Sequence, residues 1–283
     1  MILDGKALSL KIKENVKQEI SLIKEKTGKT PTLAVVIVGN DPASKIYVRN
    51  KKNACAFVGI KSIVKELPEN TTQDELISVL KELNSNQNVN GILLQLPLPN
   101  GLIDRDAINC IAPQKDVDGL SNVNLGKLLT KENGLTACTP TGIMELLKEY
   151  NINLDGKNVV IINRSLLVGK PLFQLMLNAN ATVTMCHSHT KNIAELTKNA
   201  DVVVTAVGKI GFLKADMIKK DAVIIDVSIN RTEKGLCGDA DFENLKNIAS
   251  FITPVPGGVG PLTIASLLKN TVKAFKMQNN LTF

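Results

Sequence analysis

Apolar residues recur in two alternating patterns along the first hundred residues. Residues 5–27 carry one every three or four positions, which predicts an amphipathic helix that ends before Gly28. Residues 33–38 and 91–97 are short continuous apolar runs, a pattern typical of strands that are covered on both faces. A further strand is expected at 62–65. This alternation predicts an α/β fold with a parallel sheet and right-handed crossovers.

The same alternation resumes near residue 140. Thr139 and Pro140 are expected to begin a helix that runs to about Tyr150. The segment 163–171 is expected to be a turn that leads from a strand into a second helix. Four strands are predicted in this part of the chain, at 159–162, 182–186, 202–206 and 222–227.

The segment 254–261 is rich in proline and glycine, so we expect it to lack regular structure and to allow close approach of a flat ligand. The alternative is a rigid surface connection. A last helix after it is long enough to return to the first domain. We therefore expect two α/β domains, one formed by residues 1–138 with 264–283 and one by residues 139–263.

The helix expected to begin at Pro42, with Asp41 as its cap, carries a lysine on its inward side. One side of this helix is formed by Tyr47, Lys51, Ala54, Cys55 and Val58. Four of these residues suit a buried stripe, but Lys51 is costly there unless it faces a cavity or an acid. The alternative is that Lys51 extends along the surface and keeps its ammonium group in water.

Composition limits the function classes. The 283 residues have a net charge of +7, which favours anionic partners. Aromatic residues make up 3%, with no Trp, so the stacking platforms of nucleic-acid-binding proteins are scarce. The five cysteines are scattered, and the start of the chain lacks a signal peptide. We expect free thiols, a cytoplasmic location and no membrane span.

Two polar features mark a candidate site. Gln95 lies inside an otherwise apolar strand, just before the proline that ends it, and ligands of open α/β sheets bind beyond the carboxyl ends of strands. A hydrogen-bonded core glutamine is the alternative. Asp116 and Asp118 lie in a loop with Gly119, where carboxylates are often turn residues. Their spacing does not match a calcium loop.

The turn after the strand at 159–162 has the position of a dinucleotide-binding turn, without its full glycine pattern. The next strand lacks the carboxylate that would hold the ribose of NAD. Arg164, His189 and Lys191 are available instead to meet an additional phosphate, which favours NADP. His187 and His189 are the only histidines, and no cluster of acids or cysteines completes a metal site, so no metal is expected.

Five motifs together resemble the bifunctional methylenetetrahydrofolate dehydrogenase/cyclohydrolase family. They are YVRNK at 47–51, GILLQLPLP at 91–99, KDVDG at 115–119, RSLLVGKP at 164–171 and TPVPGGVGP at 253–261. The resemblance covers nearly the whole chain. It implies a folate-binding catalytic domain and a Rossmann-like NADP-binding domain. The implied activity is NADP-linked oxidation of 5,10-methylene- to 5,10-methenyl-tetrahydrofolate, followed by hydrolysis to 10-formyl-tetrahydrofolate, in a homodimer.

The resemblance also implies roles for individual residues. Lys51 would be the catalytic base, Gln95 would hold and tune it, Tyr47 would stack on the folate, and Asp118 would bind the pterin. The substrate site would further include Leu96, Gly257, Gly258 and Pro261. The cofactor site would be lined by Asn163, Arg164, Ser165, Ser188 and Ile229.

Three residues depart from the family's usual pattern: Asn163 and Ser228 replace glycine, and His189 replaces Lys or Arg. All three concern the cofactor side and leave the choice between NADP and NAD open. Asn tolerates positive φ, so Asn163 can preserve the turn. A dehydrogenase that has lost the second activity, and a basic nucleic-acid-binding protein on the same fold, are the alternative functions.

Overall fold

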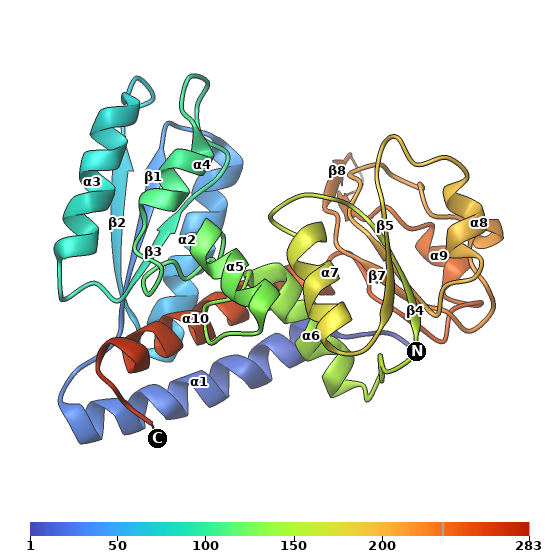
Figure 1. Ribbon diagram of the computed structural model, residues 1–283, viewed down its shortest axis with the longest axis horizontal. Helices are drawn as coiled ribbons and strands as arrows, with labels where there is room; N and C mark the ends of the chain where they lie inside the picture. Colours follow the sequence, from blue (N-terminus) through green and yellow to red (C-terminus); the bar gives the residue numbers. More distant parts are fainter. Residues whose placement is uncertain (234, 283) are drawn as a thin grey trace. The chain divides into compact units, whose positions relative to one another are not determined.

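The computed structural model describes residues 1–233 and 235–282 of the chain. The chain divides into two compact units, each with its own sheet (Figure 1). One unit consists of Met1–Leu10 and Thr139–Thr263, and the other of Lys11–Cys138 and the chain from Ile264 on. The sequence-based division differs from this one at residues 1–10. Those residues join the unit that begins at Thr139 because Leu3 N donates to Ile252 O at 2.9 Å.

The unit that contains Lys11–Cys138 is built on a parallel sheet with the strand order β2-β1-β3. The strands are β1 (Thr32–Val38), β2 (Lys61–Leu67) and β3 (Gly91–Leu94). The central strand β1 is buried along its whole length, as its continuous apolar run predicts. The strand expected at 91–97 ends earlier, at Leu94, and Gln95 follows it as a buried residue outside the strand.

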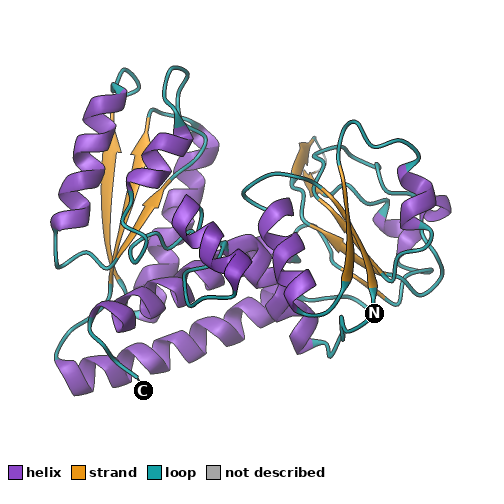
Figure 2. Ribbon diagram, viewed as in Figure 1, coloured by secondary structure: helices purple, strands orange, loops and turns teal. Residues whose placement is uncertain are grey.

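The helices of this unit that precede Cys138 are α1 (Gly5–Thr27, whose first residues belong to the other unit), α2 (Pro42–Val58), α3 (Gln73–Ser85), α4 (Asp104–Cys110) and α5 (Asn122–Thr130). Figure 2 shows α2, α3 and α4 beside that sheet and α1 below its lower end. The predicted helix at 5–27 is confirmed. Its apolar stripe is buried at Leu8, Ile12, Val16, Ile20 and Ile23.

The second unit contains a five-stranded parallel sheet in the order β10-β7-β6-β4-β5. Its strands are β4 (Asn158–Ile162), β5 (Thr182–Cys186), β6 (Val202–Thr205), β7 (Val223–Asp226) and β10 (Phe251–Ile252). The chain runs from β4 outward to β5 and then back to β6 on the other side of β4. This reversal of strand order is where ligands bind in doubly wound sheets.

Helices and a small hairpin complete this unit. The helical segments are α6 (Cys138–Glu149), α7 (Gly169–Asn178), α8 (Ile193–Thr197), the 3-10 helix η1 (Ala215–Met217) and α9 (Phe242–Leu245). The hairpin pairs β8 (Asn230–Thr232) with β9 (Gly235–Cys237). The helix expected from Thr139 begins one residue earlier, at Cys138, and Pro140 lies in its first turn, where a proline costs no hydrogen bond.

The last helix, α10, runs from Val259 to Gln278. The expectation that 254–261 lacks regular structure is therefore wrong for its last three residues, because Pro261 lies in the first turn of a helix. In the unit of the three-stranded sheet, α10 contacts α1 through an ion pair between Lys276 Nζ and Glu19 Oε1 at 3.0 Å. The predicted return of the last helix to this domain is confirmed.

Candidate active site

Helix α2 begins and ends as the sequence predicts, and this local geometry fixes the position of Lys51. The Asp41 carboxylate accepts a hydrogen bond of 2.7 Å from Ser44 N, and Gly59 ends the helix in the left-handed conformation with φ 88°. Tyr47, one turn before Lys51, was expected in the buried stripe but is 44% exposed. Within the stripe, Ala54, Cys55 and Val58 are buried, Lys51 is partly buried, and only the Tyr47 ring is exposed to solvent.

Lys51 and Gln95 form the centre of the candidate site. Lys51 Nζ donates to Gln95 Oε1 at 2.9 Å, and Gln95 Nε2 donates to Leu96 O at 2.6 Å. Since the amide NH₂ group is engaged by Leu96, its oxygen is the end that meets Lys51. Gln95 therefore accepts a hydrogen bond from Lys51 whether the amine is charged or neutral.

The surroundings of Lys51 favour its neutral form. Burial lowers the pKa of Lys51, while the negative charge of Asp118 acts in the opposite direction. Burial also raises the pKa of Cys55 to about 12, so this neighbouring thiol stays protonated and adds no charge. The alternative in which Lys51 extends along the surface does not apply, because its amine is desolvated and hydrogen-bonded to a buried side chain.

The two carboxylates of the KDVDG loop have different environments. Asp116 is 1% exposed and accepts hydrogen bonds from Gly119 N, Ser121 N and Asn124 Nδ2, among others. It is the turn residue of the pair. Asp118 instead lies within electrostatic reach of Lys51, and burial raises the pKa of its carboxyl group. The turn interpretation therefore holds for Asp116, whereas Asp118 is part of the candidate site.

The rest of this loop explains how Asp118 is held. Gly119 adopts φ +69°, and a Cβ there would come within 2.4 Å of the Thr136 backbone. Only glycine combines this backbone conformation with so close an approach. Val117 is fully buried in the core, so the neighbouring Asp118 is anchored on both sides.

Cys138 and Asn270 support Asp118, and neither was identified from the sequence. The Cys138 thiol lies within hydrogen-bonding reach of the Asp118 side chain and of Val117 O, which is 3.3 Å from Sγ, and its single proton goes to one of them at a time. Asn270, from α10, donates to Val117 O at 2.9 Å and to Thr136 O at 2.8 Å. An asparagine within the apolar face of the last helix is the signal that could have indicated this contact.

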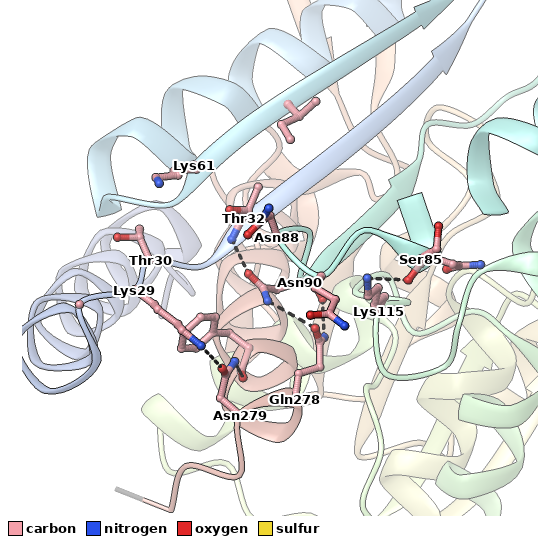
Figure 3. A pocket seen from close by; sticks show the side chains of 15 residues that line it. Lys29, Thr30, Thr32, Lys61, Ser85, Asn88, Asn90, Lys115, Gln278 and Asn279 are labelled. Atoms are coloured by element: carbon pink, nitrogen blue, oxygen red, sulfur yellow. Dashed lines mark hydrogen bonds between the residues drawn. The ribbon is translucent and has the colours of Figure 1, made fainter. Parts of the chain in front are cut away.

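A cavity of about 890 Å³ lies elsewhere in the same unit, near the residues that begin β1 and β2 (Figure 3). Parallel strands place it at the edge of the sheet opposite to Gln95. Its buried polar groups already satisfy one another. Lys115 Nζ donates to the carbonyls that end α3, those of Leu83, Asn84 and Asn86. Asn90 accepts from Thr32 N at 2.9 Å. We assign this cavity no function.

In the other unit, Asn163 organises the turn after β4. Asn163 Oδ1 accepts from Ser165 N at 2.8 Å and from Gly169 N at 3.0 Å. Asn163 preserves this turn as expected, but not through a positive φ, because it is not among the positive-φ residues of the described chain. Its side chain preserves the turn instead. A Cβ on Gly169 would come within 2.2 Å of Asn163 O, so helix α7 begins in direct contact with this turn.

The other predicted cofactor residues lie at the carboxyl ends of strands in the same sheet. Ser165 follows β4, Ser188 and His189 follow β5, and Ile229 follows β7. The side chains of Arg164, Ser188 and Ile229 are exposed. These positions share one edge of the sheet, at the reversal of strand order. The chain after β5 offers histidines and a lysine but no carboxylate, a composition that suits an additional phosphate.

Gly257, Gly258 and Pro261 pack against the first residues of the chain. Lys6 N donates to Gly257 O at 2.8 Å, and Ser9 Oγ donates to Pro261 O at 2.9 Å. A Cβ on Gly258 would come within 2.5 Å of Pro254 O. The close backbone approach at Gly258 is thus to the chain itself. A role of all three residues in walling the folate pocket stays a prediction.

Within residues 1–233 and 235–282, no group of three or more His, Cys, Asp or Glu side chains is placed to hold a metal ion. In the same part of the chain, the helices are too short or too polar to cross a membrane. All five cysteines are free thiols.

Comparison with known families matches both parts of the chain. Residues 3–118 match the tetrahydrofolate dehydrogenase/cyclohydrolase catalytic domain, and residues 137–279 match the NAD(P)-binding domain of the same family. The chain belongs to the tetrahydrofolate dehydrogenase/cyclohydrolase family. The family resemblance and the two-domain α/β fold expected from the sequence are confirmed.

Relatives in this family are similar over their full length. The chain is 54% identical to the "Bifunctional protein FolD" of Campylobacter hominis, over 97% of each chain. It superimposes on the crystal structure of the bifunctional enzyme from Campylobacter jejuni with a TM-score of 0.96 and 48% identity, covering 98% of this chain and 99% of that one. The chain is thus an enzyme of the bifunctional dehydrogenase/cyclohydrolase type.

A structure with bound cofactor is also similar. The dehydrogenase-cyclohydrolase of Trypanosoma brucei, solved as a complex with NADP cofactor and inhibitor, matches with a TM-score of 0.93 and 37% identity. The match covers 98% of this chain and 97% of that one.

Proposed function

We propose that this enzyme oxidises 5,10-methylene-tetrahydrofolate to 5,10-methenyl-tetrahydrofolate with NADP and then hydrolyses the product to 10-formyl-tetrahydrofolate, with Lys51 as the base of the second step. The observation that carries this proposal is the 2.9 Å hydrogen bond from Lys51 Nζ to Gln95 Oε1 in a setting that lowers the pKa of Lys51. The lowered pKa increases the fraction of Lys51 that is neutral, which is the form that can take a proton.

The first step places few demands on the protein as an acid or base. Bound NADP supplies the acceptor for the hydride that leaves the methylene carbon. The carbon is left as a cation that the folate nitrogens on either side stabilise by resonance. The protein therefore has to bind, orient and exclude water. We assign stacking on the folate to Tyr47, whose exposed ring is one helical turn from Lys51.

The second step needs a base. Water attacks the methenyl carbon and must lose a proton, which neutral Lys51 accepts. The amine can donate one N–H to Gln95 Oε1 while its lone pair remains directed elsewhere. When the ring opens, the protonated Lys51 returns that proton to the folate nitrogen that leaves. The hydroxyl proton of the intermediate is released to solvent, so the balance is one water consumed and one proton released.

Asp118 and Leu96 complete the proposed substrate site. Asp118 would pair with the amino edge of the pterin, because its carboxylate is engaged by Cys138 rather than by backbone amides of its own turn. The carbonyl of Leu96 orients the Gln95 amide and so acts on Lys51 indirectly. The roles of Gly257, Gly258 and Pro261 in folate binding rest on the family resemblance alone.

NADP is the proposed preferred cofactor. The proposed cofactor residues lie at one edge of the sheet and offer polar, basic and apolar side chains. They are Asn163, Arg164 and Ser165 after β4, Ser188 after β5 and Ile229 after β7. The exposed Arg164 guanidinium would bind the additional phosphate with charge-assisted hydrogen bonds. A homodimer and a cytoplasmic location, in which the five free thiols would stay reduced, belong to the same proposal.

The test is a spectroscopic assay with methylene-tetrahydrofolate and either nicotinamide cofactor. Appearance of reduced cofactor followed by decay of methenyl absorbance faster than without enzyme would support both activities. If methenyl-tetrahydrofolate accumulates and then decays only at the uncatalysed rate, the result would instead favour a dehydrogenase that has lost the hydrolytic step. Binding of DNA at physiological salt with no turnover of either cofactor would contradict the enzyme assignment.

A further inference from the structure

The loop after β6, residues 206–209, turns its backbone amides toward a buried carboxylate. Val207 N and Lys209 N donate to the Asp239 side chain at 2.6 and 2.8 Å, and Gly208 N donates to it at 3.3 Å. Asp239 is fully buried, and its many donors lower the pKa of this carboxyl group despite the opposing effect of burial. Three consecutive N–H groups thus form an anion-binding concavity that an internal side chain occupies.

Ser228 joins this loop to the end of β7. Its hydroxyl donates to Asp239 Oδ2 at 2.7 Å and accepts from Gly208 N at 3.1 Å. Ser228 N in turn donates to Asp226 Oδ1 at 3.2 Å. A glycine at position 228 could make only the last of these contacts. The hydroxyl therefore adds one direct connection between the ends of β6 and β7, through Gly208, and one indirect connection through Asp239.

Asn163 holds the same loop from the other side. Its Nδ2 donates to Ala206 O at 2.7 Å, while its Oδ1 organises the turn into α7. Asn163 follows β4 and Ala206 follows β6, so this hydrogen bond joins the two strands between which the strand order reverses. Loop 206–209 is thus fixed at its first residue by Asn163 and at the other three by Asp239 and Ser228.

We infer that Ser228 and Asn163 are positioning residues that hold loop 206–209 in the conformation that receives the nicotinamide cofactor. This rests on the proposed NADP-dependent function, because the loop lies at the strand-order reversal where dinucleotides bind. A loop that is already ordered does not have to be ordered when the cofactor binds, which favours affinity. The backbone amides of loop 206–209 face Asp239, so these amides serve to fix the shape of the loop.

The test compares Ser228→Ala, which removes the hydroxyl, with Ser228→Thr, which keeps one. Among the described residues, six hydrogen bonds reach the Asp239 side chain, and five of them remain in Ser228→Ala, so the domain is expected to fold. Ser250→Ala is the matched control, since Ser250 lies in the same unit before β10 and its hydroxyl bonds to Ala222 O.

Two measurements are made on each full-length variant. The first is cofactor affinity and turnover: Ser228→Ala should raise the KM and Kd for NADP about threefold to tenfold, with kcat at saturating cofactor unchanged. The second is hydrogen exchange of the Val207, Gly208 and Lys209 amides in the cofactor-free protein, which should be faster in Ser228→Ala. Ser228→Thr should restore both values toward wild type, and Ser250→Ala should change neither.

The outcomes separate this inference from the proposed function. Wild-type protein that binds neither NADP nor NAD would overturn both the proposed function and the role of the loop in it. Normal wild-type binding, with unchanged KM and unchanged amide exchange in Ser228→Ala, would overturn this inference alone. An equal fall of kcat and affinity, with exchange faster throughout the domain, would also overturn it, because that result indicates general destabilisation.

Discussion

Lys51 meets Gln95 through the oxygen of the glutamine amide, at 2.9 Å from Nζ. The NH₂ group of the same amide donates to Leu96 O, so Gln95 is held as an acceptor. An acceptor without charge lets Lys51 be neutral or protonated, and the burial that lowers the pKa of Lys51 then decides how much neutral amine is present. This relationship leads directly to a prediction about charge at position 95.

Gln95→Glu should suppress the hydrolytic step near neutral pH. A carboxylate beside Lys51 favours the ammonium form and raises its pKa by about 1 to 3 units, which lowers the neutral fraction about 10- to 1,000-fold. Activity should return as pH rises through the new, higher pKa of Lys51. The measurement is the pH profile of methenyl-tetrahydrofolate hydrolysis.

Gln95→Leu is the control, because it removes the hydrogen bond without adding a charge. Its pH profile should not move to higher pH, although its rate is expected to fall through looser positioning of Lys51. If Gln95→Glu and wild type reach half-maximal rate at the same pH, Lys51 does not titrate as the base.

Asp118→Ala should raise the KM for folate and leave cofactor binding unchanged, if the carboxylate pairs with the pterin. The fold should tolerate the change, since burial already disfavours the Asp118 charge and raises its pKa. A calorimetric titration with folate checks the binding. An unchanged folate Kd would exclude Asp118 from the substrate site.

The neighbouring Asp116→Ala provides the contrast. Its carboxylate accepts from three backbone amides and from Asn124, and their loss should lower the free energy of unfolding by about 2–4 kcal/mol. Denaturant unfolding of the two variants measures this difference. Equal destabilisation by both substitutions would contradict the separate roles of the two carboxylates.

Arg164→Ala should weaken the binding of NADP and leave the binding of NAD nearly unchanged. A charge-assisted hydrogen bond contributes about 1.5–3 kcal/mol, equivalent to about 10- to 150-fold in Kd. Lys157→Ala removes one positive charge at the opposite edge of the same sheet and should affect neither cofactor. Equal losses for the two cofactors in Arg164→Ala would show that this arginine does not bind the additional phosphate.

Local signals in the sequence were sufficient for the elements that carry the site. The cap at Asp41, the proline after it and the stop at Gly59 are properties of neighbouring residues, so the bounds of α2 follow from them. The buried run that forms β1 is equally local in origin. The polar residue after β3 was identifiable because parallel strands end at the ligand-binding edge of a sheet.

The remaining features depend on contacts between distant segments. The distinction between Asp116 and Asp118 depends on Asn124 and Cys138, which local spacing does not reveal. The contribution of Asn270 requires knowing that α10 returns to this unit. Asn163 was expected to act through its backbone, whereas its side chain acts through Ala206, 43 residues away.

The most direct test of the account is Lys51→Gln, because it separates the two steps. Glutamine keeps a polar group of moderate length but cannot take a proton, and general-base catalysis contributes about 10²–10⁴-fold. The variant should retain a measurable dehydrogenase rate and accumulate methenyl-tetrahydrofolate. Lys52→Gln, the same substitution at the exposed neighbouring residue, should retain both activities.

The deciding measurement is the decay of methenyl-tetrahydrofolate absorbance with each variant, compared with the decay in buffer alone. We predict that methenyl-tetrahydrofolate decays at the uncatalysed rate with Lys51→Gln and at the wild-type rate with Lys52→Gln. Hydrolysis by Lys51→Gln at the wild-type rate would contradict the role of Lys51 as the base.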